Sequence, residues 1–169
     1  MHVSIQAKIV DIYTDGSAEK RPGGRLGCGS YCKYDDEEYS MSIDCNRQLL
    51  SGYNIPTAQP CSNPTAEFVA FVETLKILRD TSRAYHLRFW IDYNGIEKWT
   101  TGQWQAKEPH IKLILQEYQA IQKSMKCIVT VHWVKGHSGV EGNTKADTLA
   151  SMYTTNTNDF ETLAVMLSV

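Results

Sequence analysis

Two strongly apolar segments of this chain each end at an aspartate, and this pattern limits how the chain can fold. The segment Lys8–Thr14 is followed by Asp15-Gly16, and the segment Leu87–Ile91 is followed by Asp92. Short apolar runs that stop at turn residues are typical of buried strands. We therefore expect Asp15 and Asp92 to lie at the carboxyl ends of two strands. If these strands are parallel neighbours, the two side chains would emerge side by side.

The rest of the chain alternates between strand-like and helix-like patterns. Further strands are predicted at 27–34, 38–45 and 128–134, and helices at 65–79, 95–101, 111–125 and 144–152. The first two of these strands are expected to form a hairpin through a tight turn at 35–37. Because the helices are long enough to cross back over a sheet, the first, fourth and fifth strands should be parallel. The sequence therefore predicts a mixed sheet in an α/β fold.

Two regions show no clear pattern. Residues 46–64 contain a glycine and three prolines without periodicity, so we expect a long irregular connection there. The residues after Tyr153, rich in Thr and Asn, are left unassigned. We expect one domain over residues 1–155 and a tail at 156–169.

Composition limits the class of protein to which this chain can belong. A chain of 169 residues that is 42% hydrophobic can bury the core of one domain. No apolar run approaches the roughly 18 residues of a membrane span, and five cysteines in strand-like runs are poor material for a disulfide framework. We expect a cytoplasmic protein with reduced thiols and no membrane contact. The net charge of −2 means that any binding to nucleic acid must be local.

Two more acids occupy unusual helix positions. Glu67 shares the apolar face of its helix with Phe71, and Asp147 shares a face with Asn143 and Ala150 rather than an evidently solvent-facing one. Charge on such a face is disfavoured unless it is paired or bound to a metal. Each acid taken alone has an ordinary explanation as a turn residue, a helix cap, a helix-dipole partner or a surface charge.

The four acids together point to a metal site. Two carboxylates about 4 Å apart repel by roughly 4 kcal/mol at an effective dielectric constant of 20, so a cluster needs a cation. Carboxylate oxygens suit Mg²⁺ or Mn²⁺, whereas zinc sites prefer thiolate and imidazole. Cys28 and Cys32 lack a second pair at zinc-finger spacing and are expected to pack in the core. Two ions held by shared carboxylates are suited to phosphodiester cleavage, which favours a nuclease.

The motifs around these acids resemble the ribonuclease HI family, also called type 1 ribonuclease H, over about residues 8 to 152. The similarity lies in Tyr-Thr-Asp-Gly-Ser at 13–17, Asn-Pro-Thr-Ala-Glu at 63–67, Ile-Asp at 91–92, Trp-Val-Lys-Gly-His-Ser-Gly at 133–139 and Gly-Asn-Thr-Lys-Ala-Asp-Thr-Leu-Ala at 142–150. The last two blocks are the most specific. The resemblance implies a ribonuclease H-like fold with a five-stranded mixed sheet in the order 3-2-1-4-5, flanked by helices.

The resemblance also implies an activity and a set of site residues. The expected reaction is endonucleolytic hydrolysis of the RNA strand of RNA/DNA hybrids with two Mg²⁺ ions, for which Mn²⁺ could substitute, leaving 5′-phosphate and 3′-hydroxyl ends. The catalytic metal ligands would be Asp15, Glu67, Asp92 and Asp147, and His137 would assist proton transfer and product departure. The expected substrate contacts are Gly16, Ser17 and Asn63 on the RNA strand, Ser62 on a DNA phosphate, Trp99 on DNA sugars, and Asn94.

This chain departs from the family pattern in the basic residues that would bind the substrate. The segment after Trp104 lacks the compact basic handle of many bacterial members and offers only Lys107 and Lys112. We therefore expect a variant without the handle, acting as a monomer with no obligate protein partner. Two alternatives are an exonuclease or integrase-like nuclease on a related sheet, and a catalytically inactive hybrid-binding module. The first would need a different acid pattern, and the second would have no reason to keep repelling carboxylates together.

Overall fold

The strands form the sheet that the sequence predicts. A computed structural model describes residues 6–55, 61–136 and 139–169. Its five-stranded sheet has the order β3-β2-β1-β4-β5, with β1 antiparallel to β2 and parallel to β4, and β4 parallel to β5. The predicted order and strand directions are confirmed. The strands are β1 (Lys8–Ala18), β2 (Leu26–Tyr34), β3 (Glu37–Cys45), β4 (Tyr85–Ile91) and β5 (Ile128–Trp133).

The helices agree with the predicted pattern in the middle of the chain and differ at three places. They are α1 (Arg47–Gly52), α2 (Asn63–Ile77), α3 (Asn94–Thr100), α4 (Pro109–Ser124), α5 (Glu141–Ala150) and α6 (Asn158–Leu167). Residues 46–64 were expected to be wholly irregular but contain α1. Helix α5 begins at Glu141 and not at the expected Thr144, and the unassigned residues after Tyr153 form α6. Within the described ranges, none of these helices combines the length and apolar character needed to cross a membrane.

The β2–β3 hairpin is confirmed. Asp35 and Asp36 both have positive φ, at 51° and 63°. Two residues in the left-handed region between adjacent antiparallel strands match the twist of a hairpin, and Asp tolerates this conformation better than most residues. The tight turn fixes the register of the two strands, which pair from Tyr34 and Glu37 to Leu26 and Cys45.

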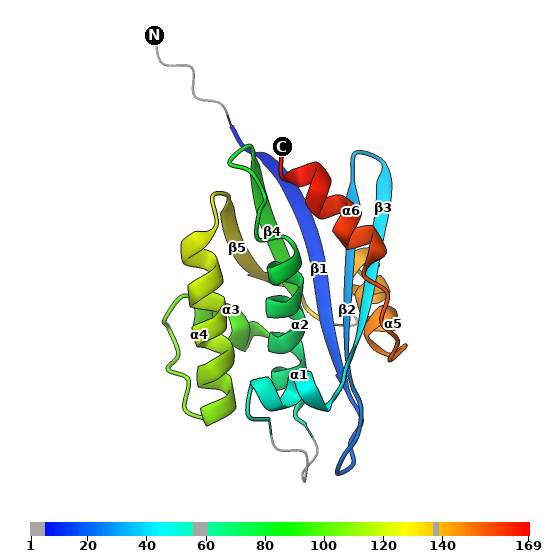
Figure 1. The fold of residues 1–169 in the computed structure, drawn as a ribbon, viewed down its shortest axis with the longest axis vertical. Coiled ribbons are helices and arrows are strands. Elements are labelled where there is room, and N and C mark those ends of the chain that lie inside the picture. Colours follow the sequence, from blue (N-terminus) through cyan, green and yellow to red (C-terminus); the bar gives the residue numbers. More distant parts are fainter. Residues whose placement is uncertain (1–5, 56–60, 137–138) are drawn as a thin grey trace.

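Helices cover both faces of the sheet where β1 and β2 run (Figure 1). Ser30 of β2 meets Thr74 of α2 through a 2.6 Å contact between their hydroxyl oxygens. Its neighbour Gly29 points to the opposite face, where an added Cβ would overlap the backbone of Ala146 and Ala150 in α5. Because successive strand residues face opposite sides, α2 and α5 lie on different faces, and β1 is buried between them.

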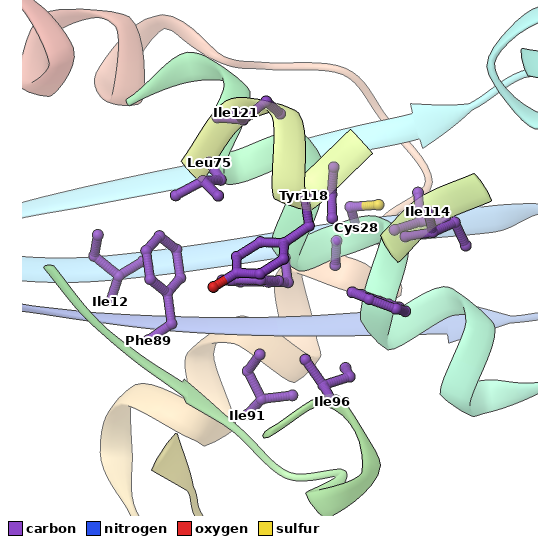
Figure 2. Packing of buried hydrophobic residues seen from close by; sticks show 14 of the residues in the cluster. Ile12, Cys28, Leu75, Phe89, Ile91, Ile96, Ile114, Tyr118 and Ile121 are labelled. Atoms are coloured by element: carbon purple, nitrogen blue, oxygen red, sulfur yellow. The ribbon is translucent and has the colours of Figure 1, made fainter. Parts of the chain in front are cut away.

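The main core lies between the sheet and the helices on its α2 face, α2 and α4 (Figure 2). Ile12 and Phe89 come from neighbouring parallel strands, and Leu75 and Tyr118 come from α2 and α4. The rings of Phe71 and Phe89 pack edge to face with centroids 4.9 Å apart, an arrangement that aromatic pairs favour. This core holds the start of α2 and the ends of β1 and β4 in fixed positions.

Strand β1 is longer than the sequence predicts, so the placement of Asp15 at its carboxyl end was wrong. Pairing with β4 stops at Tyr13 and Trp90, but pairing with β2 continues to Ala18 and Leu26. The turn residues after Thr14 predict the end of the strand, but β2 still pairs with β1 beyond them. Asp15 therefore lies inside β1, just past the point where β4 ends.

Helix α6 belongs to the same core. Its residues Phe160, Leu163 and Leu167 are fully buried, and the helix contacts β3 and α2. We predict that Leu163→Ala lowers the free energy of unfolding by about 2–5 kcal/mol, because it leaves a cavity in a packed core. Val165 of the same helix is 71% exposed, so Val165→Ala should change it by less than about 0.5 kcal/mol. Urea denaturation measures both, and equal effects would contradict the packing of α6.

Candidate metal centre

Three of the predicted acids lie close together near the carboxyl end of β4. Carboxylate oxygens of Asp15, Glu67 and Asp92 all lie within 4.8 Å of one another. Asp15 and Glu67 are 3% and 6% exposed, and Asp92 follows directly after β4 and is half-buried. The chain thus brings acids from a strand, a helix and a strand end into one partly closed cluster, as the sequence predicted.

Gly16 allows Asp15 and Glu67 to lie this close together. A Cβ at Gly16 would overlap the backbone of Ala66 and Glu67, so β1 can approach the start of α2 this closely only without a side chain there. The position of α2 is fixed by Ser62, whose Oγ accepts a hydrogen bond from the backbone N–H of Thr65 at 3.3 Å. This is an N-cap, which satisfies one of the free donors at a helix start. Gly16 therefore has a packing role in addition to its predicted substrate contact.

The electrostatics of the cluster favour a bound cation. Burial raises the pKa of Asp15 to about 7, and the charges of Asp92 and Asp147 act in the same direction. Burial also raises the pKa of Glu67 well above its usual range, and Asp15 adds to this effect. Within the described part of the chain, Glu67 Oε2 is buried without a hydrogen-bond partner. A buried acceptor without a donor, among hard oxygen ligands, fits a divalent ion such as Mg²⁺.

Two further predicted site residues, Asp147 and His137, are not among these three acids. Asp147 is exposed, although its helix neighbours Asn143 and Ala150 are buried, so the expectation that it avoids solvent was wrong. Its charge still contributes to the raised pKa of Asp15, which places it at the rim of the cluster. His137 lies outside the described residues, and its predicted role stays a prediction.

The predicted substrate contacts differ in exposure. Ser62, Asn63 and Asn94 are exposed at the starts of α2 and α3. The Ser17 hydroxyl lies 2.7 Å from the hydroxyl of Tyr153. The ring of Trp99 stacks on Phe68 with centroids 5.5 Å apart. Trp99 is therefore partly used in packing and Ser62 caps α2, whereas the exposed side chains of Asn63 and Asn94 are available for contacts with a ligand.

Sequence reasoning gave no role to Trp133, which the structure places next to Asp92, or to the buried Asn143 of α5. The indole Nε1 of Trp133 donates a 3.0 Å hydrogen bond to the backbone oxygen of Asp92. Asn143, one helical turn before Asp147, is 5% exposed, and its Oδ1 has no partner among the described residues. Both belong to the motif blocks of the sequence, but only the fold shows what they face.

Known proteins with similar sequences or folds agree on one family. The model of the family described as RNase H matches residues 7–154. A ribonuclease H of Chromohalobacter salexigens is 32% identical over 155 residues, covering 86% of this chain and 84% of that protein. The crystal structure of RNase H1 from the archaeon Halobacterium salinarum has a TM-score of 0.62 and 19% identity, covering 86% of this chain and 96% of that one. LC11-RNase H1, isolated from compost and solved in complex with RNA/DNA hybrid, has a TM-score of 0.61 and 18% identity, with 84% and 96% covered.

The raised pKa of Asp15 predicts how the stability of the metal-free protein depends on pH. An unfolded aspartate titrates near 3.8, whereas Asp15 in the folded protein titrates near 7. Because ionisation is harder in the folded state, the folded state loses stability as pH rises from about 4 to about 7, and the loss is constant above that window. Removing the charge in Asp15→Asn removes this penalty. The melting temperature of Asp15→Asn should therefore rise relative to wild type across this window.

Thermal denaturation in chelator between pH 4 and 9 measures this difference. Saturating Mg²⁺ is the control, because a cation at the cluster stabilises the wild-type carboxylates and should shrink or reverse the advantage of the variant. A difference in melting temperature that does not change with pH in chelator would contradict the burial of an ionisable Asp15.

Proposed function

This chain belongs to the ribonuclease H family, and from that premise we propose that it is an endonuclease that hydrolyses the RNA strand of RNA/DNA hybrids. We further propose that it leaves 5′-phosphate and 3′-hydroxyl ends. The observation that carries the proposal is the buried cluster of Asp15, Glu67 and Asp92, whose carboxylate oxygens lie within 4.8 Å of one another. Membership in the family makes the chain a nuclease, and the cluster supplies a group of acids suited to hold the ions of metal-dependent phosphodiester hydrolysis.

The carboxylates would hold two divalent ions. Asp15, Glu67, Asp92 and Asp147 would form the ligand set. Mg²⁺ is the proposed ion, with Mn²⁺ able to replace it, because all four ligands are carboxylates. Such ions, when bound, activate the attacking water and stabilise the charge on the leaving oxygen.

The protein's own contribution is to hold the acids in place, and a bound cation would keep them ionised. Asp15 and Glu67 lie on β1 and α2, which are in close backbone contact at Gly16. Asp147 lies on the exposed rim, where substrate and water have access. His137, which follows Gly136 in the sequence, is the proposed group for proton transfer and product departure.

Recognition of the hybrid would combine backbone contacts with a few polar side chains. LC11-RNase H1, which shares the fold, was solved with an RNA/DNA hybrid. In this chain Gly16, Ser17 and Asn63 would approach the RNA strand, where a 2′-hydroxyl distinguishes it from DNA. We assign Ser62, Trp99 and Asn94 to the remaining contacts, with Ser62 on a DNA phosphate and Trp99 on DNA sugars.

Asp92→Asn tests the proposed function. The change should abolish detectable cleavage, a loss well beyond the roughly 10–100-fold expected for removing an outer-shell partner of a metal ligand. The metal-free fold should be equally or more stable, because one repelling charge is removed from the cluster. Gel assays of cleavage and thermal denaturation in chelator measure the two effects. A large drop in melting temperature would show that Asp92 has a structural role instead.

The substrate itself is tested with wild-type protein. Labelled RNA/DNA hybrid, duplex RNA and duplex DNA are incubated with Mg²⁺ or with chelator, and the products are sized and their ends identified. Cleavage of the RNA strand of the hybrid alone, and only with Mg²⁺, is expected. Cleavage of duplex DNA, or cleavage in chelator, would refute the proposal.

A further inference from the structure

The backbone around Asp92 lies just beyond regular sheet pairing. Strand β4 ends at Ile91, and the last pair of the β4–β5 ladder joins Ile91 with Trp133. One more backbone hydrogen bond follows, from Val134 N–H to the oxygen of Ile91 at 2.9 Å. The next carbonyl along β4 is that of Asp92 itself, and the ladder supplies no donor for it. Without another partner, the peptide that carries the Asp92 side chain would be held from one side only.

A side chain of β5 provides a hydrogen bond just beyond the end of the β4–β5 ladder. The indole Nε1 of Trp133 donates to the oxygen of Asp92 at 3.0 Å. Trp133 is 51% exposed, so its ring does not serve the core as a fully buried aromatic residue would. Its specific contact is this hydrogen bond, which ties the backbone of a proposed metal ligand to the neighbouring strand.

The same segment also limits the Asp92 side chain. A Cβ placed on Gly136 would lie 3.2 Å from Asp92 Oδ2, so the chain after β5 passes close to this carboxylate. Trp133 contacts Asp92 at the backbone, and the segment around Gly136 borders its carboxylate group.

We propose that Trp133 is a positioning residue of the metal centre, which sets the orientation of Asp92 through the hydrogen bond from its indole N–H to the Asp92 carbonyl. The inference rests on the proposed function, because it treats Asp92 as a metal ligand. Trp133 touches neither the reacting atoms nor the ions. It acts through Asp92, in the way that outer-shell partners orient metal ligands.

Trp133→Phe removes the donor and keeps an aromatic ring. Binding of Mn²⁺, measured by titration calorimetry without any nucleic acid, should weaken roughly 10-fold or more. In cleavage assays at saturating metal, kcat should fall while KM for the hybrid stays near the wild-type value, because the substrate contacts are untouched. A second variant carries 3-benzothienylalanine at position 133, which replaces the indole N–H by sulfur and keeps the ring shape. It should reproduce the loss of metal affinity even if the phenylalanine variant folds poorly.

Trp90→Phe is the matched control. Trp90 lies on the adjacent strand, and its Nε1 donates a 2.8 Å hydrogen bond to Asp11 Oδ1, a side chain outside the cluster. The same chemical change there should leave Mn²⁺ affinity at the wild-type value, whatever it does to the melting temperature. Equal Mn²⁺ affinity in wild type and both position-133 variants, or an equal loss in the control, would overturn the inference alone. Failure of the wild-type protein to bind Mn²⁺ and to cleave hybrid would overturn the proposed function and this inference with it.

Discussion

The close contact between β1 and the start of α2 is the constraint on which the site depends. At Gly16 the two elements meet without an intervening side chain, since a Cβ there would overlap the backbone of Ala66 and Glu67. This contact places a buried strand carboxylate, Asp15, against a buried helix carboxylate, Glu67. Neither position would accept a charge in an ordinary core. The core on the α2 side, with Phe71 packed on Phe89 of β4, provides the stability that lets the chain keep this unfavourable pair together.

Much of this arrangement is encoded locally, and the sequence predicts it for that reason. The crossover helices predict that β1 and β4 run parallel, so that Asp15 and Asp92 come late in two strands that point the same way. The apolar face of α2 predicts that Glu67 points inward. These conclusions need only the period of the hydrophobic pattern and the rules of strand connection.

The features that the sequence did not predict depend on contacts between distant segments. The extension of β1 to Ala18 exists because β2 continues to pair with it after β4 has stopped. Helix α6 has apolar residues at helical spacing, but the polar residues before it gave no indication that it would return to β3. The burial of Asn143 depends on how α5 rests on the glycines of β2, and the bond of Trp133 to Asp92 depends on where two ladders end.

The same charges that define the site also govern how a nucleic acid can reach it. Some basic side chains on the described surface are paired with acids, as Arg88 is with Asp11 and Lys145 is with Glu38. With a net charge of −2, long-range attraction to a phosphate backbone is weak, and the acid cluster repels phosphate oxygens until its charge is neutralised. Cations at the cluster would remove that repulsion, so under the proposed function each ligand favours binding of the other. Because such coupling is reciprocal, hybrid binding must also raise the affinity of the cluster for its ions. A chain without a basic handle can therefore still select its substrate, provided that the acids are positioned well enough to bind the ions first.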